Sequence, residues 1–487
     1  MTVHQRVSYN LIGGLWDAPQ HSRLVDSIDP ATGDVVGRFA AGGQAEAKAA
    51  TAAARQAFDH TDWAQNARVR QSVLLDWAAR LERDHENLSR LLTLENGKII
   101  AQSRGEVTAA ISEIRYYAGL ARNIRGHVQE IAPGEFSTVL REPAGAAGII
   151  VPWNGPVLLL IRSLAPALCA GCTAVVKPAP QTTLVTAEVL RHLTDIAAVP
   201  RGVINMVSEI GTEVGEHLVA SPDVDVISFT GSTATGKKIM AAAAGTMKKL
   251  SMELGGKSCC LVFDDVDVAA IAPKLAAAAT IISGQQCTAA RRILVHVGRA
   301  AEMKSELSAA LSAMVVGPGL DESSHMGPLI DHNARNVVEK KMQQAFDSAD
   351  EVLLRGQSLG GRGGNTAYLT PGLIAHADSN AIFCQEEIFG PLIVIESFET
   401  EREAIAKANN TVFGLSASVW TNDGARALRV ARALRDGTVW INDHNKLFAE
   451  AEMGGYRQSG IGRLHGVDAL TDFTELKHIY QNVGMTI

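Results

Sequence analysis

The chain lacks an uninterrupted apolar run of the length that a membrane span needs. Its most apolar region, residues 145–176, contains three prolines, an asparagine and an arginine, which are costly in a bilayer. The first ten residues, MTVHQRVSYN, have neither an apolar core nor a small-residue cleavage site. We therefore expect no membrane span, no secretion and a cytoplasmic location.

The chain also lacks an excess of positive charge. Its 45 Lys and Arg residues are outnumbered by 52 Asp and Glu residues, for a net charge of −7. Such a surface offers no basic field to phosphate backbones or anionic lipids, whereas it favours solubility. We expect no nucleic-acid partner and no membrane partner.

Cysteine is scarce, with six residues in 487. Without a signal peptide, so few thiols predict free cysteines in a reducing compartment. Cys169 and Cys172 form one C-x-x-C, but no second Cys/His pair lies at metal-ligand spacing and the flanking residues are apolar. We expect these two thiols to pack in a core, and we predict no metal site.

The chain is long enough for two large domains. Residues 45–125 show an Ala-rich amphipathic pattern that predicts helices, and from about residue 144 short β-type runs alternate with helical ones. The alternation restarts after Gly256, which predicts a second α/β unit. We therefore expect an α/β protein with helices covering parallel sheets and a ligand cleft between two lobes.

The segment FTGSTATGKK follows a predicted strand and opens a helix. Gly231 and Gly236 match the glycines of a phosphate-binding loop, but Lys238 stands where that motif needs a Ser or Thr for magnesium. This disfavours a nucleotide hydrolase. Two interpretations remain, a helix N-terminus that receives a pyrophosphate and an ordinary tight turn.

Three further positions carry polar groups suited to catalysis. Cys287 follows a Gly-Gln-Gln bend, Glu253 ends an apolar strand before two glycines, and Asn154 lies between two prolines after a strand. Each has an alternative structural interpretation: a core thiol, a salt bridge to a lysine such as Lys257, and a helix cap. In a cleft they would instead be a nucleophile, a general base and an oxyanion donor.

Nine segments in order resemble the NAD(P)-dependent aldehyde dehydrogenase superfamily: PWNGP, AGCTAVVKPAP, FTGSTATG, MELGGKS, GQQC, EEIFGP, NNTVFGLSASV, GTVWIND and GGYRQSGIGR. This resemblance implies a Rossmann-like NAD(P)-binding domain of residues 1–122 and 144–255, and a catalytic domain of residues 256–455. Residues 123–143 and 470–487 would form a small β oligomerisation element. A homodimer or homotetramer is implied.

The resemblance also implies a mechanism. Cys287 would attack an aldehyde, the Asn154 amide and the Cys287 backbone N–H would hold the oxyanion, and Glu253 would activate water to release the acid. The positions that match cofactor-binding residues of the family are Trp153, Lys177, Gly231, Ser232, Glu387 and Phe389. A CoA-acylating relative is the alternative enzyme, although such relatives usually lack the Glu253-type base. A catalytically silent homologue is disfavoured by the presence of all three catalytic residues.

The sequence departs from the family pattern at three positions. Pro180 replaces a common Glu that repels the 2′-phosphate of NADP, so NAD is the expected cofactor and NADP use is open. Ser163 replaces a common Lys, and Leu464 a common acid, so a proton relay through those groups is in doubt.

Arg162 lies where semialdehyde-oxidising and aromatic-aldehyde-oxidising branches of the family carry Arg. We expect it either to bind a carboxylate or polar group of the substrate or to form a salt bridge at the helix surface. Arg292 also fits the family pattern, and we expect it to be a structural anchor.

Overall fold

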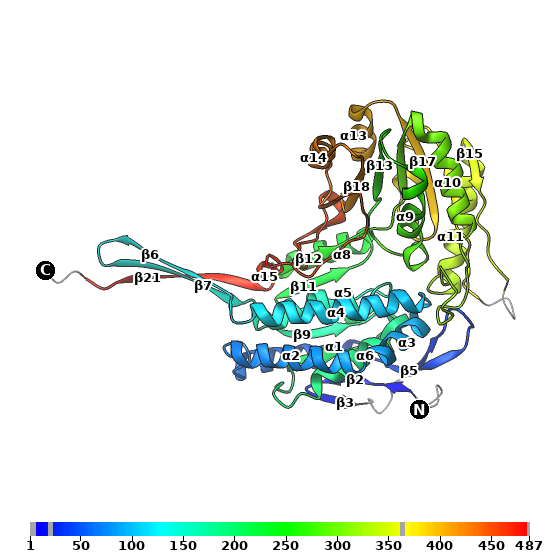
Figure 1. Ribbon diagram of the computed structural model, residues 1–487. Coiled ribbons are helices and arrows are strands. Elements are labelled where there is room, and N and C mark those ends of the chain that lie inside the picture. Colours follow the sequence, from blue (N-terminus) through cyan, green and yellow to red (C-terminus); the bar gives the residue numbers. More distant parts are fainter. Residues whose placement is uncertain (1–5, 18–22, 361–365, 485–487) are drawn as a thin grey trace.

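Two lobes, each built on one large sheet, and a projecting arm make up the molecule (Figure 1). The structure is a computed structural model that describes residues 6–17, 23–360 and 366–484. Within these ranges no helix is long and apolar enough to cross a membrane.

The first lobe contains an eight-stranded sheet whose five central strands are parallel. In spatial order its strands are β20 (Gly460–Ile461), β12 (Lys249–Glu253), β11 (Val226–Thr230), β8 (Ala146–Ile150), β9 (Thr173–Lys177), β10 (Ile204–Met206), β2 (Asn10–Ile12) and β3 (Leu15–Asp17). The central strands are buried on both faces, as expected of parallel strands between helices.

Helices cover both faces of this sheet. One face packs against α2 (Ala67–Arg83), α3 (His85–Asn96), α4 (Ile100–Leu120), α5 (Pro156–Ala170) and α6 (Thr183–Thr194). The other face packs against α1 (Gln44–His60), α7 (Glu213–Ala220) and α8 (Thr233–Ala243). The predicted helical region and the predicted strand-helix alternation are thereby confirmed, whereas the strands before residue 45 were not predicted.

The second lobe contains a seven-stranded sheet, parallel except for β15. Its strands are, in spatial order, β15 (Glu351–Leu354), β16 (Gly372–Ala375), β17 (Leu392–Phe398), β14 (Arg292–His296), β13 (Cys259–Val262), β18 (Ser416–Trp420) and β19 (Thr438–Ile441). The surrounding helices are α9 (Val268–Thr280), α10 (Ala300–Ser312), α11 (His332–Ser348), α12 (Ile382–Gln385), α13 (Glu401–Asn409) and α14 (Gly424–Ala433). The fold class is α/β, as predicted.

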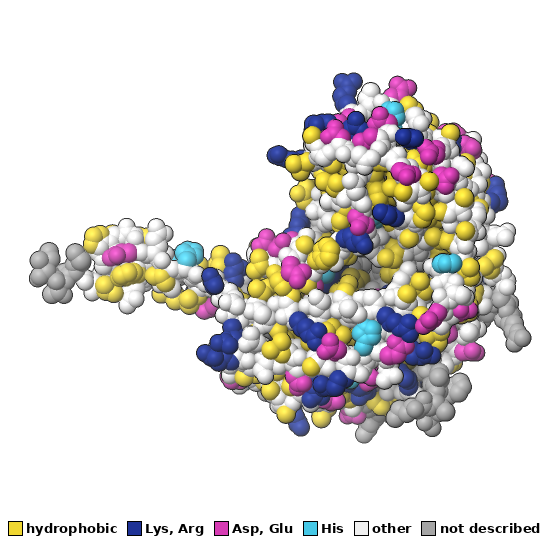
Figure 2. All heavy atoms as spheres, in the orientation of Figure 1, with side chains coloured by type: hydrophobic (Ala, Val, Ile, Leu, Met, Phe, Trp, Pro, Cys, Tyr) yellow, Lys and Arg dark blue, Asp and Glu magenta, His cyan; other side chains and the backbone are white. Residues whose placement is uncertain are grey.

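The chain passes from one large sheet to the other between Glu253 and Cys259, and β20 returns to the first. The carboxyl ends of β8, β11 and β12 therefore face the second lobe. In open parallel sheets, ligands bind at that end. Figure 2 shows the molecule hollowed between the lobes.

Two three-stranded sheets complete the fold. One consists of β1 (Val7–Ser8), β5 (Val35–Ala41) and β4 (Arg23–Ile28). The other is the arm, formed by β21 (Thr474–Asn482), which follows the short helix α15 (Ala469–Asp472), with β7 (Glu135–Pro143) and β6 (His127–Ala132) (Figure 1). Residues 485–487 of the expected oligomerisation element lie outside the described residues.

Candidate active site

Cys287 lies on a strained loop between α9 and β14. Ile282 and Ser283 have φ values of 49° and 56°, and Gly284 follows at 73°. A non-glycine residue rarely adopts this region, so the surrounding contacts must hold it there. The Ser283 hydroxyl donates to the Gly327 carbonyl at 2.7 Å, and no Cβ fits at Gly284 because the Gly390 carbonyl group would lie at 2.5 Å. The bend turns the chain out of α9.

The exposure of Cys287 differs from that of the other cysteines. Cys287 is half-buried, whereas the other five are buried, and all six are free. Cys169 and Cys172 pack in the core of the first lobe, as predicted. The Cys287 thiol is desolvated within the cleft, which raises its pKa to about 12, although the Arg162 charge lowers it. The thiol is therefore protonated at neutral pH, and a catalytic thiolate needs further stabilisation.

Two arginines anchor the Cys287 loop. The buried Arg291 donates to the carbonyls of Gly390, at 2.6 Å, and Gln286, at 3.2 Å. The buried Arg292 forms a bidentate pair with Glu396, with N–O distances of 2.5 and 2.9 Å. Arg292 is thus the structural anchor that was expected. Arg291 was not predicted, and its only sequence signal is its place beside Arg292 before an apolar strand.

Asn154 follows β8 and faces the loop that carries Cys287. Its side-chain amide donates to the Gln285 carbonyl at 3.0 Å. The capping interpretation is wrong, since α5 begins at Pro156 with Gly155 as its N-cap and has no side-chain cap. An amide has two N–H donors, so the second remains for a ligand oxygen.

A buried ion pair holds the backbone around Asn154. The Lys98 ammonium donates to the Asn154 carbonyl at 2.7 Å and pairs with Glu106. The other Glu106 oxygen accepts the N–H groups of Val157 and Leu158 in the first turn of α5. Sequence reasoning missed this pair, because nothing in the segment NGKIIAQSRGE indicates that both side chains are buried.

We expect Lys98→Met to lower both stability and turnover. The substitution leaves the Glu106 carboxylate buried without its cation, and removing one partner of such a pair costs about 3–5 kcal/mol. It also frees the Asn154 carbonyl, so kcat should fall while the affinity for NAD+ stays unchanged. Thermal unfolding and steady-state kinetics measure the two effects. Lys304→Met, which breaks the exposed pair with Glu351, is the matched control and should cost less than about 1 kcal/mol.

Glu253 ends β12 and is only 3% exposed. Burial raises its pKa to about 7, while the charges of Arg162 and Arg463 lower it. The alternative interpretation of a salt bridge to Lys257 is wrong, because Lys257 donates to the Glu386 carbonyl at 2.7 Å. The carboxylate lies instead 3.7 Å from the Arg162 guanidinium. A carboxyl group that titrates near neutral pH suits a general base.

Several residues expected at a cofactor gather beside the Cys287 loop. The rings of Trp153 and Phe389 are perpendicular at 5.6 Å, and Glu387 accepts the Gly256 N–H at 3.1 Å. A cavity of about 360 Å³ is lined by Trp153, Glu387, Phe389 and Gln285. An aromatic wall beside the carboxylates of Glu387 and Asp331 suits a nicotinamide riboside.

The other expected cofactor residues lie along the edge of the first sheet. Gly231 and Ser232 connect β11 to α8, where Ser232 is the N-cap and accepts the Thr235 N–H at 3.2 Å. Lys177 ends β9, and its ammonium lies 3.5 Å from Glu209. The helix N-terminus and the lysine form a donor set that fits a pyrophosphate and a ribose.

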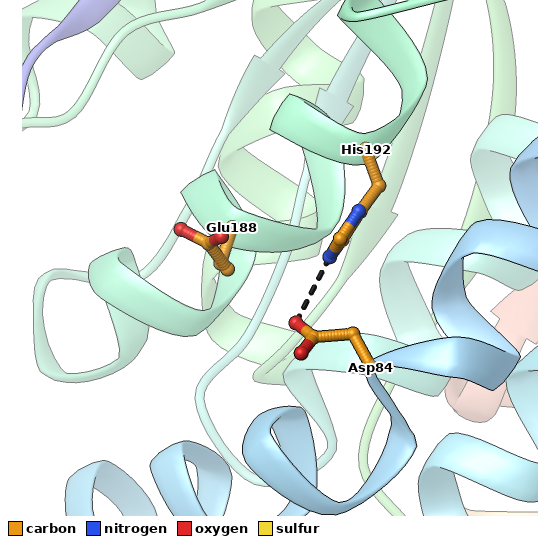
Figure 3. A group of neighbouring side chains, drawn as sticks. All are labelled: Asp84, Glu188 and His192. Carbon is orange, nitrogen blue, oxygen red and sulfur yellow. Dashed lines mark hydrogen bonds and ion pairs between the residues drawn. The ribbon is translucent and has the colours of Figure 1, made fainter.

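One group of three potential metal ligands occurs in the described part of the chain, away from Cys287. Asp84 lies between α2 and α3, while Glu188 and His192 lie on α6 (Figure 3). The His192 ring nitrogen is 3.0 Å from Asp84, which also accepts from Asn87 at 2.7 Å, and Glu188 lies 3.9 Å from Arg191. Asp84 and His192 already have hydrogen-bond partners within the protein, so we assign no metal to the group.

Comparison with known proteins decides the family. The family model described as "Aldehyde dehydrogenase family" matches residues 16–479. The chain belongs to the aldehyde dehydrogenase family. It is an NAD(P)-dependent oxidoreductase that acts on an aldehyde group, and its fold is the two-lobed α/β fold of that family.

Relatives align with this aldehyde dehydrogenase over almost its whole length. It is 37% identical to betaine aldehyde dehydrogenase of Bacillus subtilis, over 97% of this chain and 96% of the relative. It is 36% identical to the NADP(+) succinate-semialdehyde dehydrogenase of Escherichia coli, over 96% of each chain. A crystal structure of betaine aldehyde dehydrogenase from Staphylococcus aureus in complex with NAD+ matches with a TM-score of 0.95 and 34% identity, over 99% of this chain and 96% of the other.

Proposed function

We propose that this enzyme oxidises an aldehyde and water to a carboxylic acid, with Cys287 as nucleophile, Asn154 as oxyanion donor and Glu253 as general base. The observation that carries the proposal is the meeting of the three groups at one cleft. Asn154 bonds to the residue two before Cys287, and the Glu253 charge acts on the Cys287 thiol. The division into an NAD(P)-binding domain (1–122 and 144–255) and a catalytic domain (256–455) belongs to this proposal.

In the first half of the reaction, the Cys287 sulfur bonds to the aldehyde carbon and forms a thiohemiacetal. The oxyanion accepts the free N–H of the Asn154 amide and the backbone N–H of Cys287. NAD+, when bound, supplies the hydride acceptor that converts this adduct to a thioester. Glu387, Trp153 and Phe389 would hold its nicotinamide end, while Lys177, Gly231 and Ser232 would hold the adenosine and pyrophosphate.

In the second half, Glu253 removes a proton from water, which attacks the thioester carbon and expels the Cys287 thiolate. The buried base supports hydrolysis over transfer to CoA. An aldehyde panel (aliphatic, aromatic, ω-carboxylate and trimethylammonium) tests the proposal through NADH formation and identification of the product with and without CoA. Acid formed at an unchanged rate without CoA is expected. A product that is an acyl-CoA would contradict it.

The names of the relatives indicate the chemical class of the natural aldehyde and not its identity. Curated relatives are named for betaine aldehyde and succinate semialdehyde. We propose a semialdehyde or an aromatic aldehyde, since relatives are also named for succinate semialdehyde and phenylacetaldehyde. The panel ranks them by kcat/KM.

NAD+ is the proposed cofactor, with NADP+ use open because Pro180 replaces the usual Glu. The carboxylate of Glu209 supports NAD+ as the cofactor, although the usual Glu is absent. Glu209 is 2% exposed, pairs with Lys177, and accepts the N–H groups of Val214 and Gly215 at the start of α7. A 2′-phosphate beside Lys177 would meet this negative group.

Glu209→Gln should therefore lower the preference for NAD+ over NADP+ by about tenfold, because the amide keeps an acceptor for α7 and removes the charge. The ratio of kcat/KM for the two cofactors measures the effect. Glu213→Gln, at the start of the same helix, is a control for a general loss of negative charge. An unchanged ratio in Glu209→Gln would show that Glu209 does not discriminate between the cofactors.

The arm supports an oligomer. Figure 2 shows hydrophobic side chains along the arm. The exposed apolar residues of its strands are Val128, Ile131, Leu140, Leu476, Ile479 and Tyr480, and Val483 follows β21. Apolar side chains gathered on a projecting sheet indicate a protein interface. We propose a homodimer or homotetramer formed through residues 123–143 and 470–487. Light scattering should give two or four times the chain mass of 51.7 kDa.

A further inference from the structure

Arg162 projects from α5 into the cleft, and its side chain is almost wholly buried at 2% exposure. The surface salt bridge considered from the sequence is therefore wrong. Its Nη2 atom donates to the Thr230 hydroxyl at 3.2 Å, and its Nη1 atom faces the Met453 sulfur at 3.9 Å. Neither neighbour carries charge. A buried cation is costly unless an anion compensates it, and Glu253, at 3.7 Å, is its ion-pair partner in the described structure.

Glu253 in turn forms its ion pair with Arg162. Neither of its oxygens has a hydrogen-bond partner among the described side chains. The charged or titratable groups that act on it are Arg162 from α5, Arg463 after β20, Asp472 at the end of α15 and Cys287. Arg162 is the largest of the three influences that lower the Glu253 pKa, ahead of Arg463 and the Gly455 backbone, while burial and Asp472 oppose ionisation.

The side chains of Ser163 and Leu464 offer Glu253 no cation. The Ser163 hydroxyl is a neutral acceptor for Ser228 at 3.0 Å, and Leu464 is an apolar residue with 1% exposure. Arg162 is therefore the ion-pair partner of Glu253 among the described residues, at 3.7 Å.

We propose that Arg162 is a positioning residue for Glu253: it keeps the carboxylate ionised and facing the cleft, and this role, not recognition of a substrate anion, is what the reaction requires of it. The inference rests on the proposed role of Glu253 as general base. A substrate carboxylate at the same guanidinium would put two buried anions on one cation, which already has its counter-charge.

The test compares Arg162→Met and Arg162→Lys with an uncharged aliphatic aldehyde and with succinate semialdehyde. In Arg162→Met we expect kcat at pH 7 to fall about fivefold for both aldehydes, because the pH dependence of thioester hydrolysis moves up by about one pKa unit from the value near 7. Hydride transfer precedes this step, so rapid mixing should show a burst of about one NADH per subunit. Arg162→Lys retains the charge and should restore most of kcat and the original pH profile.

The control variant is Arg70→Met, which removes another buried arginine, bonded only to backbone carbonyls. It should lower the unfolding temperature without moving the pH profile. Loss of activity in Arg162→Met confined to succinate semialdehyde, as a raised KM, would overturn the proposal in favour of substrate recognition. An unmoved pH profile, or a Lys variant as slow as the Met variant, would overturn it as well. Absence of NADH formation by the wild type would instead refute the proposed function itself.

Discussion

Cys287→Ala is expected to abolish aldehyde oxidation while leaving NAD+ binding intact. Without the sulfur no thiohemiacetal forms, so the hydride has no activated carbon from which to leave, and the rate should fall by about 10⁴-fold or more. The cofactor site should survive, because the contacts of Trp153, Glu387 and Phe389 do not involve the thiol. NADH absorbance measures the loss, and a fluorescence titration measures the affinity for NAD+.

Cys169→Ala is the matched control. Cys169 is a free thiol in the core of the first lobe, so its removal should cost some stability and no catalytic chemistry. Activity in Cys287→Ala above about a tenth of the wild-type value would contradict the assignment of the nucleophile.

Glu253→Gln should separate the two halves of the reaction. Acylation does not need the base, so one NADH per subunit should form quickly and turnover should then slow by about 10²- to 10⁴-fold. The acyl group should remain on the enzyme as a thioester, detectable as an added mass by mass spectrometry of the intact protein. Glu386→Gln, which alters the exposed pair with Lys341, serves as the control. Equal turnover in Glu253→Gln and wild type would eliminate Glu253 as the base.

The pKa of Glu253 predicts how kcat depends on pH. The Glu253 pKa is raised to about 7, chiefly by burial, and only the ionised carboxylate can accept a proton from water. Where hydrolysis limits turnover, kcat should therefore be low below pH 7, where the Glu253 carboxyl is protonated. It should rise as the pH increases through about 7. Glu253→Gln should remove this limb, and a wild-type limb near the ordinary value of 4.5 would contradict the raised pKa.

Much of the fold could be predicted from the sequence, since buried parallel strands form short apolar runs separated by helical segments. The runs that became β8, β11 and β14 are of this kind, and the glycines at Gly255 and Gly256 lie where the chain changes sheets. The strands before residue 45 could not be recognised. They are short or lie in a small separate sheet, so their side chains alternate weakly between buried and exposed.

Cys287, Glu253 and Asn154 were identified from their residue types and their local sequence, and the family model supports the resemblance on which their roles rest. Their partners were not identifiable in this way. Lys98 lies far from Asn154 in the chain, and Glu209 far from Lys177, and only the packing of α5 and of the sheet edge brings each pair together.

The sequence by itself determined the family, the α/β class and the residue types available for chemistry, because these depend on local patterns. Only the tertiary structure decided how those residues are charged and held. Arg162 illustrates the difference, since from the sequence it was either a substrate ligand or a surface charge. The burial of Arg162 against Glu253 gives Arg162 a third role, because an isolated buried charge is costly and the two groups therefore depend on each other. Their burial depends on every segment that surrounds them, so it could not be read from a local pattern.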